Sequence, residues 1–186
     1  MRSGVLIAVA AMVFVVALAN YAVQFPLNDW LTWGAFTYPV AFLITDLSNR
    51  AFGPARARRV VYAGFVLAVA LSIWLATPRI AVASGVAFLA TQLWDIAIFN
   101  RLRHQDWWRA PLASSVLASA LDTAIFFSVA FAGTGLPWTT WAIGDYAVKL
   151  GVAAVMLIPF GALRLWIRPW TGQQPTGQQP AGQQQS

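Results

Sequence analysis

Long apolar runs separated by short polar connections dominate the pattern of this chain. Six runs are apparent, and they span residues 4–23, 31–47, 60–77, 80–99, 110–132 and 138–167. Each is close to the roughly 20 apolar residues that a helix needs to cross about 30 Å of hydrocarbon. None shows the alternation over about ten residues that a strand of a membrane barrel requires. The pattern therefore predicts an all-α, polytopic membrane protein built as a six-transmembrane-helix bundle.

The composition agrees with a chain embedded in lipid. Of its 186 residues, 59% are hydrophobic and only 10% are charged, which is more apolar surface than a globule of this size buries. The six runs leave no room for a soluble domain, and neither G-x-x-x-x-G-K-[ST] nor G-x-G-x-x-G occurs. We expect residues 1–170 to form one membrane domain that draws its energy from a gradient or from a separate chain.

The basic residues indicate the orientation of the bundle. Ten of the twelve Lys and Arg lie at the two ends of the chain and in the second and fourth connections, which all fall on one side. Arg79 lies on the other side, and Lys149 lies inside a run. Because positive loops stay in the cytoplasm, both termini are predicted to be cytoplasmic in the cell inner membrane. The same retention of Lys and Arg on the cytoplasmic side explains the net charge of +6, so the charge does not indicate a nucleic-acid partner.

The two ends of the chain carry signals of their own. The first run ends near Ala17, Leu18 and Ala19, a sequence that imitates a secretory cleavage site, but the run is long for a signal and we expect it to be retained. Residues 171–186 read TGQQPTGQQPAGQQQS, without an apolar residue capable of packing. Such a segment cannot form a core, so we expect a disordered cytoplasmic tail.

The residue types in this chain do not indicate a cofactor site or a metal site. The chain has no Cys, which excludes disulfides and thiolate ligands, and its single His104 cannot form a histidine cluster. Neither H-E-x-x-H nor G-x-S-x-G occurs. We therefore expect no cofactor and no enzymatic activity, although an intramembrane enzyme that uses two Asp residues as acid and base remains an alternative.

Ionisable residues inside the apolar runs are the candidate functional groups. All six acidic residues are Asp, and four of them fall inside or at the ends of the runs: Asp46, Asp95, Asp122 and Asp145. Each such residue costs about 2.5 to 3.5 kcal/mol on insertion scales, so it usually faces a cavity or a partner. Four in one small bundle indicate a binding or transport site.

The second run ends in TDLSNR, which places three polar side chains on one helix face. Asp46, Asn49 and Arg50 are three or four residues apart, so Asp46 can pair with Arg50 while Asn49 stays free to bind. An ion pair that only fixes the helix end is the alternative. Gly53 and Pro54 are expected to end this helix.

The fourth run contains a second polar group, in QLWDIAIFNRLR. Gln92 and Asp95 are one turn apart on one face, and Asn100 stands at the exit of the run. A carboxylate accepts paired N–H groups, an amide donates and accepts, and Trp94 offers a stacking face. This set suits a planar heterocycle rich in donors, and the alternative is that Gln92 and Asp95 form hydrogen bonds to other helices.

The fifth and sixth runs hold the remaining charges. Asp122, followed by Thr123, continues a stripe of serines that is expected to face the bundle interior. Asp145 and Lys149 are four residues apart and can pair within one helix. Lys149 can equally reach Asp122 or Asp95 across the bundle, where a shared lysine would couple substrate binding to proton binding.

Three ordered motifs resemble a known family. They are LTWGAFTYPVAFLITDLSNRAFG followed by ARR, QLWDIAIFNRLR followed by WW, and SSVLASALDTAIFFSVAF. Over about residues 15–165 the chain resembles the queuosine precursor transporter family, also called the vitamin uptake transporter family. The resemblance implies a six-helix inner-membrane importer of 7-cyano-7-deazaguanine and 7-aminomethyl-7-deazaguanine for tRNA queuosine salvage. The substrate-binding positions it implies are Asn20, Trp33, Asp46, Asn49, Arg50, Gln92, Asp95, Asn100, Asp122 and Thr123.

The residues suggest how such a site would work. Asp95 or Asp122 would accept the ring N–H and exocyclic amine, while Gln92 or Asn20 binds the carbonyl edge and Trp94 or Trp33 stacks. A substrate-binding subunit that needs a separate ATPase module is an alternative, as is a membrane component without a ligand. The coupling energy, the preferred deazaguanine and a homodimeric state are left open by the sequence.

Overall fold

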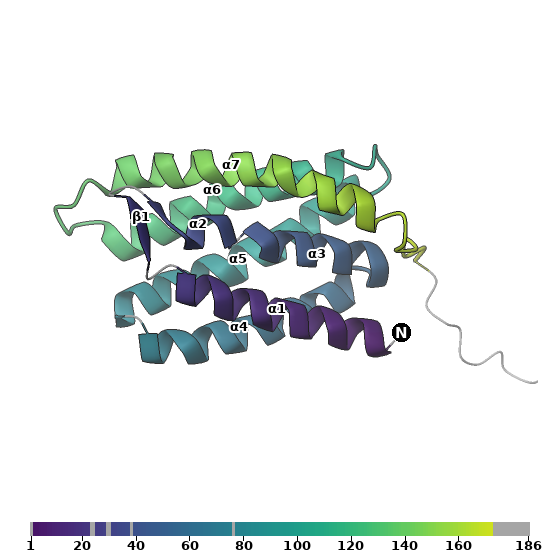
Figure 1. Cartoon of the computed structure of the whole chain (residues 1–186), viewed down its shortest axis with the longest axis horizontal. Coiled ribbons are helices and arrows are strands. Elements are labelled where there is room, and N and C mark those ends of the chain that lie inside the picture. Colours follow the sequence, from purple (N-terminus) through teal and green to yellow (C-terminus); the bar gives the residue numbers. More distant parts are fainter. Residues whose placement is uncertain (1, 23–24, 29–30, 38, 76, 173–186) are drawn as a thin grey trace, which may run out of the picture.

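The computed structural model describes residues 2–22, 25–28, 31–37, 39–75 and 77–172, and helices make up nearly all of them. The elements are α1 (Arg2–Ala22), β1 (Pro26–Asn28), β2 (Leu31–Thr32), α2 (Gly34–Thr37), α3 (Pro39–Phe52), α4 (Pro54–Leu75), α5 (Pro78–Leu102), α6 (Arg109–Phe131) and α7 (Trp138–Leu163). The long helices run up and down, and α1 begins at the end of the bundle where α7 finishes (Figure 1). Within the described residues, α5, α6 and α7 are long and apolar enough to cross a membrane.

The second apolar run differs from its prediction. In place of one helix over residues 31–47, β2 pairs with β1 in a short antiparallel hairpin, α2 makes a single turn, and α3 starts at Pro39. Proline has no N–H to donate and disfavours helical backbone in the residue before it, so it suits the first position of a helix. Pro39 therefore begins a helix here and does not kink one. Residues 173–186 of the predicted tail lie outside the described residues.

The turn between α3 and α4 ends the helix at the predicted place. Gly53 has a φ of +80°, a conformation that favours glycine, and Pro54 opens α4 directly afterwards. A Cβ atom on Gly53 would lie 2.7 Å from the Trp170 ring. The basic segment that follows, Arg56 to Arg59, thus forms the first turns of α4 and is not part of an open connection.

Helix α3 lies at the centre of the bundle. It packs against α1, α4, α5, α6 and α7, whereas α1 and α7 each have a large share of their residues exposed. Fully buried side chains from three neighbouring helices form the apolar core beside it, with Met12 from α1, Val60 and Val61 from α4, and Ile96 from α5. Every polar residue on the inner face of α3 is consequently sealed from water and lipid.

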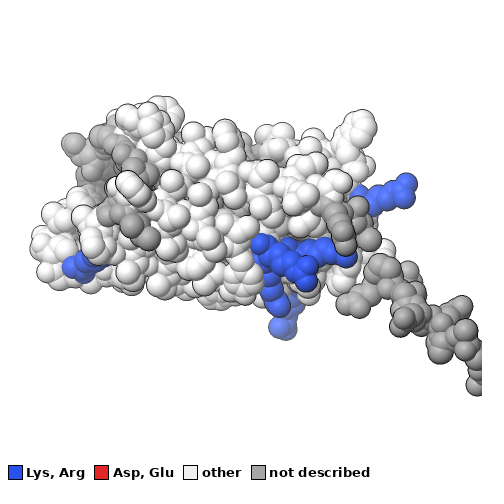
Figure 2. Space-filling view, turned by 90° about the horizontal axis from the view of Figure 1, so that it is seen from below, with Lys and Arg blue, Asp and Glu red and all other residues white. Residues whose placement is uncertain are grey.

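Charge gathers at the two ends of the bundle. Figure 2 shows most of the visible Lys and Arg side chains toward the right-hand end, where α1 begins and α7 finishes in Figure 1, and one basic group at the opposite end. At the start of α5, Arg79 donates from Nε to the carbonyl of Val129 at 2.8 Å and from Nη2 to that of Ala132 at 2.5 Å. These carbonyls end α6 and lack helical partners, so Arg79 caps α6 from its neighbour.

The close approach of α1 and α4 at Gly64 gives a test of the packing. A Cβ atom on Gly64 in α4 would lie 2.6 Å from Cγ of buried Met12 in α1. We expect Gly64→Ala to lower the free energy of unfolding by about 1–3 kcal/mol, because overpacking a core forces its neighbours apart. Thermal unfolding in detergent micelles measures this.

The matched control is Gly151→Ala in α7, where nothing lies within 4 Å of the added methyl group. That variant should stay within about 1 kcal/mol of the parent, the size of the helix-propensity gain. Equal effects of the two substitutions would contradict the close approach of α1 and α4.

Candidate functional site

Two groups of buried polar side chains occupy the interior. The first, here called the carboxylate cluster, joins α3, α5 and α6 and consists of Thr45, Asp46, Gln92, Asp95 and Ser114. The second, here called the lysine cluster, joins α6 and α7 and consists of Asp122, Thr123, Asp145 and Lys149. All members of the first are at most 2% exposed, which is rare for carboxyl groups without a dedicated partner or ligand.

Gln92 is held in a defined orientation. Thr45 Oγ1 donates to Gln92 Oε1 at 2.5 Å, which joins α3 to α5. Because the amide oxygen of Gln92 accepts this bond, its amide nitrogen is the group that remains to bind another partner. Gln92 Nε2 is buried and has no hydrogen-bond partner within the part of the chain that the structure describes. The site therefore presents one unsatisfied, oriented donor.

Asp95 supplies the complementary acceptors. It stands one turn after Gln92 on α5, is 0% exposed, and has Asp46 and Ser114 as its polar neighbours. Neither of its oxygens accepts a hydrogen bond of good geometry from the described residues. Two buried carboxyl groups side by side repel each other when both are ionised, so Asp46 and Asp95 need either a proton shared between them or a donor from a ligand. A ligand with paired N–H groups would meet that need.

Asp46 and Asn49 have other hydrogen-bond partners than the sequence predicted. Asp46 accepts a hydrogen bond from Ser114 Oγ at 3.2 Å and does not pair with Arg50, whose Nε has no partner among the described groups. Asn49 is not free either: its Nδ2 donates to the Ile96 carbonyl at 3.0 Å, and its Oδ1 accepts from Arg103 at 3.2 Å. The prediction for this helix face is wrong because it ignored neighbouring helices, which offer these groups closer partners.

The lysine cluster combines both expected pairings. Lys149 Nζ lies 2.5 Å from Asp145 Oδ2 on its own helix and 2.7 Å from Asp122 Oδ2 on α6. Thr123 Oγ1 donates to Asp145 Oδ2 at 2.8 Å and lies 3.3 Å from Lys149 Nζ. One cation between two carboxylates leaves the group with an excess of one negative charge.

The predicted serine stripe of α6 does face inward. Ser114, Ser115, Ser119 and Asp122 are all buried, and Ser119 Oγ has no partner within the described structure. The stripe connects the two clusters along α6, since Ser114 contacts Asp46 and Asp122 contacts Lys149.

Other predicted positions lie apart from the clusters. Trp94 is 45% exposed on the side of α5 away from Gln92, and Trp33, before α2, is 50% exposed. Asn100 is half-buried near the end of α5. The side chain of Asn20 lies outside the described residues. The structure therefore brings neither Trp94 nor Trp33 onto the carboxylate cluster.

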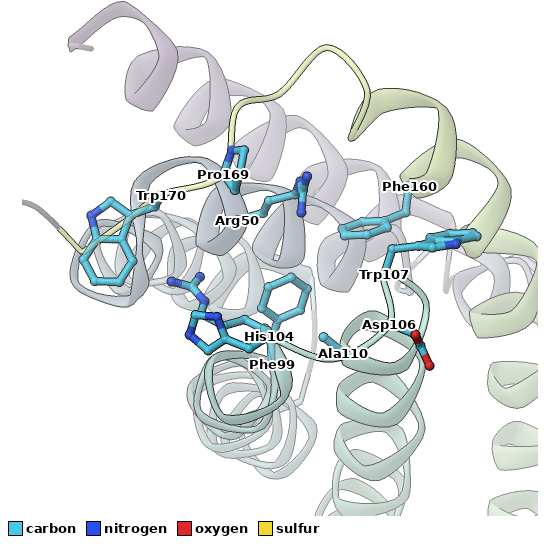
Figure 3. Close-up of a pocket in the computed structure, with 10 residues that line it drawn as sticks. Arg50, Phe99, His104, Asp106, Trp107, Ala110, Phe160, Pro169 and Trp170 are labelled. Atoms are coloured by element: carbon cyan, nitrogen blue, oxygen red, sulfur yellow. The ribbon is translucent and has the colours of Figure 1, made fainter.

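A pocket at the end of the bundle was missed by the sequence reasoning. It is lined by Arg50, Phe99, Arg103, His104, Asp106, Trp107, Ala110, Phe160, Pro169 and Trp170 (Figure 3). Burial lowers the pKa of Arg103, and the positive charge of Arg50 lowers it further. The sequence shows only that basic residues and tryptophans gather on this side, a pattern that membrane topology already explains.

Apolar helices packed around buried carboxylates define a membrane protein of the transporter class. The family described as "Putative vitamin uptake transporter" matches residues 32–77 and 71–163, and the chain belongs to this family, as its motifs indicate. The "Queuosine precursor transporter" of Escherichia coli (strain K12) is 36% identical over 80% of this chain and 81% of the relative. The "Probable queuosine precursor transporter" of Haemophilus influenzae (strain ATCC 51907 / DSM 11121 / KW20 / Rd) is 33% identical over 79% and 80%. No solved structure gives a significant match.

The lysine cluster makes a prediction about stability. Replacing Lys149 by methionine leaves the buried Asp122 and the partly buried Asp145 beside each other without a cation. We expect Lys149→Met to lower the free energy of unfolding by about 3–5 kcal/mol, the usual cost of removing one partner of a buried ion pair. Thermal unfolding in detergent measures the loss.

Two further variants make this test specific. Adding Asp122→Asn to Lys149→Met removes one of the stranded charges and should restore part of the stability. The control Arg168→Gln removes an exposed cation after α7 and should have little effect. If Lys149→Met is as stable as the control, the cluster does not carry the charges assigned to it.

Proposed function

We propose that this chain is an inner-membrane importer of queuosine precursors, the 7-deazaguanine bases used in tRNA queuosine salvage. The names of its relatives and its family membership support a transporter with this substrate class. We assign transport to the membrane domain of residues 1–170, with six spans and both termini in the cytoplasm. The up-and-down helices, which begin and finish at one end, support that topology.

The substrate proposal rests on two neighbouring residues of α5 whose polar atoms have no hydrogen-bond partner among the described residues. Asp95 presents two acceptor oxygens and Gln92 presents one donor nitrogen, all buried and without partners among the described residues. A deazaguanine displays the complementary edge, with a ring N–H and an exocyclic amine beside a carbonyl oxygen. Asp95 binds the two donors and Gln92 Nε2 binds the carbonyl, while Thr45 keeps the amide in the required orientation.

The burial of this site determines what transport requires. Gln92 and Asp95 are both 0% exposed, so a base reaches them only after helices separate. The structure thus corresponds to a closed state between two open ones, as alternating access demands. Two contacts close the site: the Thr45 bond to Gln92 joins α3 to α5, and the Ser114 bond to Asp46 joins α6 to α3.

The first test of this proposal is substitution of the acceptor. We expect Asp95→Asn to weaken binding of 7-cyano-7-deazaguanine by about tenfold to hundredfold, since hydrogen bonds to a charged group contribute about 1.5–3 kcal/mol. Binding to purified protein in detergent is measured by isothermal titration calorimetry, with adenine as a ligand that lacks the matching edge.

The matched control is Asp106→Asn, which makes the same change at a carboxylate that is 60% exposed. It should bind the deazaguanine as the parent does. Retained affinity in Asp95→Asn, in protein shown to be folded, would remove Asp95 from the site.

The proposed topology has a separate test, which the absence of Cys simplifies. We expect a cysteine introduced by Leu136→Cys, between α6 and α7, to react with a membrane-impermeant maleimide in spheroplasts prepared from whole cells. A cysteine introduced by His104→Cys, between α5 and α6, should react only after the membrane is opened. The reverse labelling pattern would place the termini outside.

A further inference from the structure

Three arginines lie at the end of the bundle where α3, α5 and α7 finish: Arg50 and Arg103 line the pocket described above, and Arg164 lies over the ring of Trp107, which also lines it. Arg50 ends α3, Arg103 follows α5 and Arg164 follows α7. Arg50 lies within electrostatic reach of both others, so the three positive charges repel one another. The acidic residue in the pocket lining, Asp106, is paired with Arg109 at 3.0 Å, and in Figure 3 its carboxylate points away from Arg50.

Specific contacts hold two of these groups in place. Arg103 Nη2 donates to the Asn49 carbonyl at 2.8 Å, and its guanidinium lies 5.0 Å from the centre of the Trp170 ring. The Arg164 guanidinium lies 4.5 Å from the centre of the Trp107 ring. The backbone N–H of Trp170 donates to the Arg50 carbonyl at 2.7 Å, which keeps the C-terminal segment over the pocket. These contacts keep the arginines in place although their positive charges repel one another.

Each of the three also keeps a donor free. Arg50 Nε, Arg103 Nη1 and Arg164 Nε are buried and have no hydrogen-bond partner within the described residues. Buried donors without acceptors are costly, and buried like charges add to that cost. An anion with several acceptor oxygens would satisfy the donors and the charge together.

We propose that this arginine pocket binds a phosphate group. Planar guanidinium groups match the oxygens of phosphate and are the preferred ligands for it in proteins. The pocket measures about 80 Å³, well below the roughly 300–1,000 Å³ of pockets for drug-sized ligands. Its size therefore suits a small anionic group. The site is separate from the carboxylate cluster and does not depend on which substrate is transported.

Two sources can supply the phosphate group. The first is the headgroup of an anionic lipid, since Trp107 and Trp170 line the pocket and tryptophans concentrate at the membrane interface. The second is a free phosphate ion in the adjoining solution. Both would use the same three arginines, so the experiment has one arm for each source.

The experiment compares the parent with two double variants by native mass spectrometry in detergent. Arg50→Gln with Arg164→Gln removes two free donors while retaining the Arg103 bonds to Asn49. Arg58→Gln with Arg59→Gln removes the same charge from exposed positions at the start of α4. The first arm titrates phosphatidylglycerol, with phosphatidylcholine for comparison, and the second arm adds sodium phosphate against sodium chloride at equal ionic strength.

We expect the Arg50 and Arg164 pair of substitutions to weaken the tightest phosphatidylglycerol binding event at least tenfold, and the Arg58 and Arg59 pair to change it less than twofold. Displacement of the lipid by sodium phosphate, with the same dependence on the arginines, would identify free phosphate as a ligand of the same site. Lack of displacement would identify the lipid headgroup. Equal losses in the two double variants, or no loss in either with folded protein, would overturn the proposal.

Discussion

Burying a carboxyl group among apolar helices is the constraint on which this structure depends. A charge in such surroundings must find a partner on the same helix or a neighbour, and that requirement fixes which helices lie together. Lys149 joins α7 to α6 through Asp122, Ser114 joins α6 to α3 through Asp46, and Thr45 joins α3 to α5 through Gln92. Asp95 is left with oxygens that no described residue satisfies. Among the carboxylates of the two clusters, Asp95 is thus the one whose oxygens both lack a hydrogen bond from the described residues.

Local spacing predicted some of these features and was silent on others. The pairing of Asp145 with Lys149 follows from a separation of four residues on one helix, and the turn at Gly53 follows from its sequence with Pro54. Asp46 and Arg50 have the same spacing, yet they do not pair. Which of several partners a side chain chooses depends on helices distant in sequence, and spacing along one helix carries no information about them.

Helix α3 links the carboxylate cluster to the arginine pocket. Thr45 binds Gln92 on α5, and one turn later Asn49 binds both the Ile96 carbonyl of α5 and Arg103. A shift of α3 along α5 would break these bonds together. In the transport cycle proposed above, opening of the buried site would therefore also rearrange the pocket.

The arginine pocket also bears on how the protein is made. Its walls come from the ends of α3, α5 and α7 and from Trp170, so no part of the chain shorter than about residue 170 contains all of them. Insertion into a membrane proceeds from the N-terminus as the ribosome delivers the chain. The pocket consequently forms only after α7 and Trp170 are in place, so an anion bound there would be held only by a chain that has folded to that point.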